Sequence, residues 1–305
     1  MIKNTQVDKY WQEHTVNSLN FATPEESLQY LKWRSLKYPF FHDLMELYNA
    51  DEDWTVLDYG CGPGNDLVGY SCLSKAKKVI GVDISDKAFY LAKKRLLLHN
   101  IDVDTSNSKV QLIKISDALS SEGSVLKNTI ANESIDHIYC QGVLHHVTEP
   151  TLILKEFYRI LKKGSKACIM VYNRNSIFYH LYVGYMKRVL AGMEGTTEEI
   201  FTRSTDGSEC PISYTTIPEE YIPICEEAGF SVEYRGGYLC DLEIDLVFKY
   251  LENAKLDFRC DKEHRNFLKK IKINLQAATL ADGSPYYEGK LAGIGGVYVL
   301  HKEDK

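Results

Sequence analysis

The stretch VLDYGCGPGNDL (Val56–Leu67) carries most of what this sequence reveals about its architecture. An apolar run ends in an acid, Asp58, and three glycines follow at alternate positions, Gly60, Gly62 and Gly64. Glycines in such a turn let the backbone adopt positive φ angles and approach a ligand closely. The stretch is therefore typical of a ligand-binding turn between a buried strand and a helix.

Segments typical of strands alternate with segments typical of helices over residues 54–173. Strands are expected at WTVLDYG, KVIGVDI, KVQLIKI, SIDHIYCQGVL and KACIMVYN. Helices are expected at Asn65–Leu73, at DKAFYLAKKRLLLHN and in TLILKEFYRILKKG, where basic residues form the last turn and Gly164 lies just beyond it. This alternation predicts a parallel sheet with helices on both faces. Ligands of such sheets bind at the carboxyl ends of the strands, where the glycine turn lies.

Composition narrows the class of protein. The 305 residues are 44% hydrophobic and 26% charged, an ordinary globular balance, and the net charge of −6 disfavours a large nucleic-acid footprint. No segment reaches the roughly 18 uninterrupted apolar residues that a membrane span needs, and the N-terminus lacks the apolar core of a signal peptide. The eight scattered cysteines form no CxxC pair, which favours reduced thiols over disulfides or zinc. We therefore expect a cytoplasmic protein without a metal site.

Residue spacing separates the ligands that a glycine turn can serve. A P-loop needs a lysine after its last glycine, and none follows Gly64. A dinucleotide turn needs GxGxxG, whereas this chain has GxGxG followed by Asn65. A carboxylate at Asp58 would also repel a pyrophosphate. A nicotinamide dehydrogenase is therefore a distant alternative.

Three acidic residues indicate which chemical groups the ligand carries, once a nucleoside triphosphate and a dinucleotide are disfavoured. Asp58 suits an ammonium group above the glycine turn, and Asp83, at the end of the second strand, can accept hydrogen bonds from both ribose hydroxyls. Asp117, after the third strand, can receive the exocyclic amine of adenine. An ammonium group, a ribose and an adenine together describe S-adenosylmethionine. Each acid has an alternative role as a helix cap or turn former, which the residues alone leave open.

The sequence resembles the class I S-adenosylmethionine-dependent methyltransferases in VLDYGCGPG, VIGVDIS, ISDAL and IDHIYCQGVLHHVTEPTLILKEFYRILKKGSKACIMVYN, over roughly residues 50–175. Weaker similarities in STDGSECPISYTTIPEEYIPICEEAGF point to an uncharacterised bacterial branch expected to modify small molecules or glycans. The resemblance implies a Rossmann-like α/β fold with a seven-stranded sheet, whose last strand is antiparallel and lies beside the sixth. SVEYRGGY and GGVYVLHK would form these two strands, but a long segment separates them where the family commonly has a short hairpin.

The resemblance also implies cofactor contacts. It places the glycines under the methionine part, Asp58 at its amino group, Asp83 at the ribose and Asp117 at the adenine. Aromatic side chains near the N-terminus, Tyr10 with Trp11 and His14, could close over the sulfonium or only pack on the core. The full set of expected cofactor contacts is Tyr10, Asp58, Gly60, Gly62, Gly64, Asp83, Ile84, Asp117, Ala118, Gln141 and Gly142.

His145 and His146 are the candidate catalytic residues. Methyl transfer is an in-line displacement that depends mainly on proximity and orientation, and an oxygen nucleophile usually needs a base. Histidine has a suitable pKa for that role. His146 is the preferred candidate for base or substrate contact, with His145 second. The alternative is that both only pack behind the cofactor or orient their loop.

Substrate contacts are expected from Tyr172, Asn173 and Arg174, which end the fifth strand, and from Arg203. Arg203 and Asp206 lie in a polar stretch with TDG turn chemistry, so a turn-only role is the alternative. The basic run Lys262–Lys272 could attract an anionic substrate such as a nucleotide-linked sugar, although such runs are more often solvated helix faces.

We expect three regions: an N-terminal helical cap over residues 1–50, an S-adenosylmethionine-binding core over 51–175, and substrate-lid insertions with the last two core strands over 176–305. The helical insertion before the last strand should span residues 241–290.

The expected activity is methyl transfer to a small molecule, at a hydroxyl oxygen of a secondary metabolite or glycan precursor. The alternatives are an N-methyltransferase, an RNA or protein methyltransferase, and a non-catalytic S-adenosylmethionine-binding protein. The acidic balance and the absence of a [DN]PP[YF] motif after the fourth strand weigh against the amine and macromolecular alternatives. The oligomeric state stays open.

Overall fold

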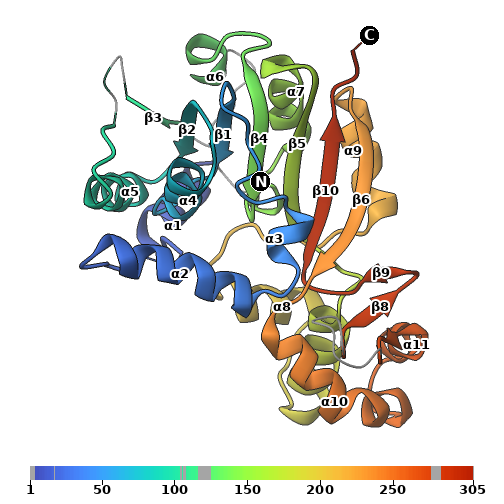
Figure 1. The fold of residues 1–305 in the computed structure, drawn as a ribbon. Coiled ribbons are helices and arrows are strands. Elements are labelled where there is room, and N and C mark those ends of the chain that lie inside the picture. Colours follow the sequence, from blue (N-terminus) through green and yellow to red (C-terminus); the bar gives the residue numbers. More distant parts are fainter. Residues whose placement is uncertain are drawn as a thin grey trace.

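The computed structural model describes residues 4–16, 18–103, 105, 108–115, 125–275 and 283–304. At its centre lies a seven-stranded sheet with the strand order β3-β2-β1-β4-β5-β10-β6 (Figure 1). Its strands are β1 (Thr55–Tyr59), β2 (Lys78–Asp83), β3 (Val110–Lys114), β4 (Ile135–Gln141), β5 (Leu161–Tyr172), β6 (Ser231–Tyr238) and β10 (Gly295–His301). The first five strands pair in parallel, and β10 is antiparallel to both β5 and β6. The predicted Rossmann-like sheet, with its antiparallel last strand beside the sixth, is confirmed.

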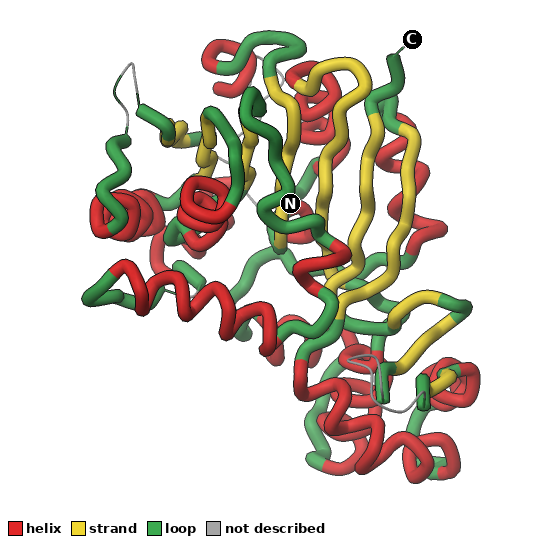
Figure 2. The backbone as a smooth tube through the Cα atoms, viewed as in Figure 1, coloured by secondary structure: helices red, strands yellow, loops and turns green. Residues whose placement is uncertain are grey.

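Helices cover both faces of the sheet (Figures 1 and 2). The helices α2 (Pro24–Lys37), α3 (Phe41–Leu44), α4 (Asn65–Leu73) and α5 (Asp86–Leu98) pack on one face, and α6 (Val125–Thr129), α7 (Pro150–Ile160) and α9 (Pro218–Glu227) pack on the other. Successive strand residues serve opposite faces: Val56 joins one apolar cluster and Leu57 the other. Strands buried on both faces are apolar throughout, which explains the continuous apolar runs in the sequence.

One helix ends earlier than predicted. The sequence predicts a helix that ends just before Gly164, but α7 ends at Ile160 and Leu161 already pairs with Ile135 of β4. Gly164 has a φ of +72° and donates its N–H to the Lys302 carbonyl at 2.8 Å. Pairing with the sheet therefore overrides the helical preference of this segment.

The C-terminal half adds a second unit at the carboxyl edge of the sheet (Figure 1). It begins with η2 (Phe178–Leu190), a π-helix that follows β5, and α8 (Thr197–Thr205). Between β6 and β10 come α10 (Asp241–Leu256), α11 (Lys262–Lys270) and the short strands β7 (Lys272–Ile273), β8 (Pro285–Tyr287) and β9 (Lys290–Leu291). The expected helical insertion is present, and its small three-stranded sheet was not predicted.

An apolar cluster of its own holds this unit together. It joins side chains of η2, α10 and α11, among them Leu181, Leu246 and Leu268. At the other end of the chain, α1 (Asn4–Glu13) packs against α5. Among the described residues, no helix combines the length and the apolar character needed to cross a membrane.

Candidate active site

A cavity of about 620 Å³ opens at the carboxyl ends of the parallel strands. Its wall combines the glycine turn after β1, the ends of β2 and β4, the helix α1, and the segments where α2 ends, α8 ends and α10 begins. The cavity therefore lies between the sheet and the two flanking helical parts, which is where the topology predicts a ligand.

Glycine is required at the three positions of the turn for different structural reasons. All have positive φ angles, of +77° at Gly60, +50° at Gly62 and +81° at Gly64. A Cβ at Gly60 would collide with Val143, and one at Gly64 would press on Ala92 of α5. A Cβ at Gly62 would meet no protein atom within 4 Å. Gly60 and Gly62 line the cavity, whereas Gly64 packs behind it.

Asp83 closes this turn from the end of β2. Its carboxylate accepts hydrogen bonds from the backbone N–H groups of Gly62 and Ser85, both at 2.8 Å. Burial raises the pKa of Asp83, and these N–H groups oppose that shift. Asp83 and the neighbouring Ile84 both line the cavity. A carboxylate held by two N–H donors still has lone pairs to offer to ligand hydroxyls.

Asp58 lies behind the turn with only 2% of its surface exposed. Its Oδ2 atom has no hydrogen-bond partner among the described residues. Burial and the nearby Asp66 raise the pKa of Asp58 well above its ordinary value, and Arg34 opposes this. A buried carboxylate with an unused oxygen is costly, so Asp58 is suited to a cationic ligand group.

Two buried arginines hold the start of α4, and neither was predicted. Arg34 of α2 pairs with Asp66, with Nη1 donating to Oδ2 at 3.1 Å, and Tyr48 donates to the same carboxylate at 2.9 Å. Arg95 of α5 donates to the Asn65 side chain and to Ser27. Bidentate arginine–carboxylate pairs fix orientation, so these contacts define the first turn of α4.

The N-terminal helix α1 is anchored over the loop after β2. The Gln12 amide donates to the Ile84 carbonyl at 2.7 Å and accepts from the Asp86 N–H at 2.9 Å. Tyr10 lines the cavity and donates to the Asp206 carbonyl, and the Trp11 ring lies 4.7 Å from the His146 ring. Closure of these aromatic residues over the cofactor, one of the two roles considered for them, stays a prediction. Gln12 was not among the expected contacts.

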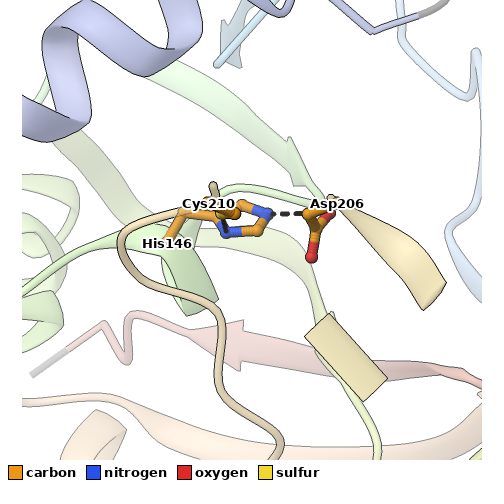
Figure 3. A group of neighbouring side chains, drawn as sticks. All are labelled: His146, Asp206 and Cys210. Atoms are coloured by element: carbon orange, nitrogen blue, oxygen red, sulfur yellow. Dashed lines mark hydrogen bonds and ion pairs between the residues drawn. The ribbon is translucent and has the colours of Figure 1, made fainter. Parts of the chain in front are cut away.

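His146 lies in the cavity wall on the 3-10 helix η1 (Leu144–His146), and its ring lies beside Asp206 and Cys210 (Figure 3). Its Nδ1 atom is 2.7 Å from the Ile212 carbonyl. A carbonyl only accepts, so Nδ1 carries the proton and Nε2 is the basic nitrogen of the neutral ring. Burial lowers the pKa of His146, and Asp206 and the Ile212 carbonyl oppose this shift.

Asp206 faces the basic nitrogen of His146, with Oδ1 3.6 Å from Nε2. Three hydroxyl groups donate to its carboxylate: Tyr172 at 2.8 Å to Oδ1, and Thr205 and Ser213 at 2.7 Å each to Oδ2. Burial and Asp206 raise the pKa of Tyr172 well above its ordinary value. Asp206 is the C-cap residue of α8, as expected for a residue in a turn. Its side chain also lines the cavity.

The three groups of Figure 3 lie close together. Atoms offered by His146, Asp206 and Cys210 lie within 4.8 Å of one another. The Cys210 Sγ atom is 3.9 Å from Nδ1, and Asp206 faces Nε2. Nδ1 is also engaged by the Ile212 carbonyl, so Nε2 is the ring nitrogen that can accept a proton. The expectation of no metal site stays a prediction.

His145 lies behind the cavity wall, fully buried. Its ring packs on Tyr172 with centroids 3.8 Å apart, and neither ring nitrogen has a hydrogen-bond partner among the described residues. Burial lowers the pKa of His145 well below its ordinary value. The structure therefore brings His146, but not His145, to the cavity.

The other expected contacts divide into two groups. Tyr172, Gln141 and Gly142 line the cavity. Asn173, Arg174 and Arg203 lie outside its wall: Asn173 donates to the Gly293 carbonyl at 2.9 Å, Arg174 pairs with Glu220, and Arg203 donates to the Glu194 carbonyl at 2.7 Å. Asp117 and Ala118 lie outside the described residues.

The sheet topology and this site together define an S-adenosylmethionine-dependent methyltransferase of class I. The chain belongs to a family described as a methyltransferase domain, whose profile matches residues 50–228. The ubiquinone biosynthesis O-methyltransferase of Nitrosomonas europaea is 30% identical over 134 residues, which are 44% of this chain and 50% of that protein. The chain spans about half the length of the curated relatives it matches.

Two solved structures share the fold at low identity. Haemonchus contortus phosphoethanolamine N-methyltransferase 2, in complex with S-adenosylhomocysteine, has a TM-score of 0.52 at 16% identity, covering 99% of this chain and 61% of that one. Streptomyces coelicolor geranyl diphosphate C-methyltransferase, also with S-adenosylhomocysteine, has a TM-score of 0.50 at 13% identity, covering 97% and 96%. The names of these three proteins span oxygen, nitrogen and carbon acceptors, so the shared fold does not define the acceptor atom.

The residues present fit S-adenosylmethionine as the cofactor. The unused oxygen of Asp58 suits its ammonium group, and the open space at Gly62 allows a ligand to approach the backbone. Asp83 can accept from its ribose. The cofactor supplies an electrophilic methyl group on a sulfonium.

Proposed function

We propose that this enzyme methylates a hydroxyl oxygen of a small molecule, a secondary metabolite or glycan precursor, with His146 as the general base. The observation that carries the proposal is the orientation of the His146 ring. Its Nδ1 donates to the Ile212 carbonyl, which leaves the basic Nε2 next to Asp206 in the cavity wall. An alcohol is a poor nucleophile until its proton is removed, so an oriented base favours oxygen as the acceptor.

The proton path follows from these contacts. The lowered pKa keeps His146 neutral near pH 7, so Nε2 can accept the proton of the acceptor hydroxyl. The acceptor oxygen would then form the new C–O bond as the methyl–sulfur bond breaks and S-adenosylhomocysteine leaves. Asp206, 3.6 Å away, then stabilises the imidazolium. Its three hydroxyl donors hold that carboxylate in place. The proton finally leaves the imidazolium for solvent. In this scheme His146 is the catalytic residue, Asp206 a positioning residue, and His145 supports the loop from behind.

The proposal gives the remaining residues two tasks. Tyr10, Asp58, Asp83, Ile84 and Gln141, with the glycine turn and Gly142, would bind the cofactor. Tyr172 would contact the acceptor, because it lines the cavity and donates to Asp206. The three regions would act as cap (1–50), cofactor-binding core (51–175) and substrate lid (176–305), with S-adenosylmethionine between cap and core.

The test compares His146→Gln with the wild type in two assays. Calorimetric titration measures S-adenosylmethionine binding, and mass spectrometry measures S-adenosylhomocysteine formation with a panel of hydroxylated small molecules. Loss of a general base should lower turnover about 100-fold or more, with cofactor affinity unchanged. His42→Gln is the control, because the His42 side chain is 53% exposed on α3 and outside the cavity wall.

Several outcomes would contradict the proposal. Full turnover by His146→Gln would exclude His146 as the general base and favour a nitrogen acceptor. Product formed only with RNA or protein acceptors would assign a macromolecular substrate. Cofactor binding without S-adenosylhomocysteine formation from any acceptor would favour a non-catalytic binding protein.

A further inference from the structure

Beyond His146, the cavity continues into a part lined by apolar and aromatic side chains from separate elements. We call this part the aromatic chamber; it comprises Tyr38, Phe41, Tyr172, Phe178, Tyr238 and Ile294. The Tyr238 ring lies 4.9 Å from that of Phe41 and 6.0 Å from that of Tyr38, both edge to face. Phe178 and Ile294 belong to one apolar cluster, against which Tyr38 and Tyr172 pack. The chamber is therefore a continuous surface.

The aromatic chamber adjoins both functional parts of the site. Gln141, at the end of β4, donates from Nε2 to the Tyr238 hydroxyl at 3.0 Å. Tyr172 donates to Asp206, the partner of His146. A compound seated in the chamber can thus present a hydroxyl group between the cofactor turn and the proposed base.

The charges of the cavity wall disfavour anionic compounds. Its lysine and arginine side chains are both already paired: Arg34 with the buried Asp66, and Lys37 with Asp241 at 2.6 Å. Asp83 and Asp206 also line the cavity, and within the described ranges neither pairs with a lysine or arginine. A phosphate group would enter a wall that carries the carboxylates of Asp83 and Asp206 and whose lysine and arginine already have carboxylate partners, which costs free energy.

The basic run considered for anion binding lies elsewhere. The described structure places Lys262–Lys270 on α11, in the C-terminal unit, and none of its residues lines the cavity (Figure 1). The Lys270 side chain lies 3.9 Å from Glu288 of the same unit. This run therefore cannot supply the missing cation.

One buried carboxylate shapes the aromatic chamber. Glu243 is 0% exposed and accepts hydrogen bonds from three backbone N–H groups: Phe178 at 2.8 Å, Cys240 at 2.8 Å and Ile294 at 3.2 Å. All three donors belong to cavity-lining residues, on η2, at the start of α10 and before β10. The chamber is therefore preformed, which lowers the cost of binding a rigid compound.

We propose that the aromatic chamber binds the flat apolar body of an uncharged hydroxylated aromatic compound, and that it rejects phosphorylated and nucleotide-linked sugars. This inference rests on the proposed function and narrows its acceptor class. Aromatic walls favour a flat ring by stacked and edge-to-face contacts, whereas a sugar needs many hydrogen-bonding groups. The acceptor is thus an aromatic metabolite rather than an activated glycan precursor.

The test uses the full chain saturated with S-adenosylhomocysteine and three probes. 2-Naphthol is the uncharged aromatic probe, 2-naphthyl phosphate has the same ring system with its hydroxyl esterified to an anionic phosphate, and UDP-glucose is the nucleotide-linked sugar. Calorimetric titration should show binding of 2-naphthol and affinities at least about tenfold weaker for the two phosphates. Tyr238→Leu, titrated at saturating S-adenosylhomocysteine, should weaken 2-naphthol binding about five- to tenfold.

Tyr90→Leu is the matched control, because Tyr90 is 68% exposed on α5. Tighter binding of either phosphate, no binding of 2-naphthol, or an unchanged affinity in Tyr238→Leu would overturn the inference. Methyl transfer to a sugar hydroxyl that still depends on His146 would also overturn it, while the proposed function would stand. Failure of the proposed function would be recognised by a different result, namely full turnover by His146→Gln.

Discussion

The Gln12 side chain donates to the Ile84 carbonyl at 2.7 Å, which joins the first helix of the chain to the loop after β2. The same amide accepts from the Asp86 N–H at 2.9 Å. A primary amide satisfies both groups at once because it carries a donor and an acceptor side by side. The helix α1 thereby becomes part of the cavity wall rather than a free N-terminal extension.

Gln12→Ala should weaken S-adenosylmethionine binding about five- to tenfold, because two hydrogen bonds worth about 1 kcal/mol each hold α1 in the wall. Calorimetric titration measures the change. Gln29→Ala, on the exposed side of α2, provides the control and should bind as the wild type does. Equal affinities for the Gln12 variant and the wild type would show that α1 does not enclose the cofactor.

Asp83→Asn should weaken S-adenosylmethionine binding about 10- to 100-fold, because hydrogen bonds to a charged acceptor are worth about 1.5–3 kcal/mol. The amide can still accept from Gly62 or Ser85, so the turn should keep its shape. Circular dichroism and thermal unfolding check the fold beside the titration. The exposed Asp53→Asn should leave the affinity unchanged; unchanged affinity in Asp83→Asn would refute the assignment of the ribose site.

The rate of methyl transfer should depend on pH through His146. Because its pKa is lowered, His146 is neutral at pH 7. The value of kcat/KM should therefore fall only at pH values below the ordinary pKa of histidine. Asp206 raises the pKa of His146, so Asp206→Asn should move this acid limb to still lower pH. The maximal rate should also fall, because the imidazolium loses its stabilising carboxylate. If the midpoint of the acid limb of kcat/KM is the same in Asp206→Asn as in the wild type, the electrostatic coupling of Asp206 to His146 is contradicted.

Glu243 should make stability depend on pH. Burial raises the pKa of Glu243 from 4.5 to about 7, so the folded state binds this proton more tightly than the unfolded state does. Its contribution to the free energy of unfolding is therefore greatest below pH 4.5 and declines as pH rises to about 7. Urea unfolding of the wild type and of Glu243→Gln measures this difference.

The stability advantage of the wild type over Glu243→Gln should shrink across that pH window. Glu252→Gln, in the same helix but with its side chain 79% exposed, should parallel the wild type at every pH. A constant difference between the wild type and Glu243→Gln would show that the buried carboxylate does not titrate there.

Much of the cofactor-binding core could be predicted from local sequence. The acid before the glycine turn, the acid that ends the second strand, and the strand–helix alternation depend on backbone conformations of neighbouring residues. Thr23 also caps α2 through residues close in sequence, accepting from the Glu26 N–H at 3.3 Å. The early end of α7 escaped prediction because pairing of Leu161 with β4 decides it.

The sequence by itself determined the class of fold, the cofactor and two candidate bases, His146 and His145, because each is encoded in residues that are close along the chain. Only the tertiary structure decided that Asp206 faces His146, that Arg34 holds Asp66, and that Glu243 joins three wall segments. No period or turn motif links such distant positions. They meet because α1, α2 and the C-terminal unit pack around the carboxyl edge of one sheet, and burial there requires each polar group to find a partner.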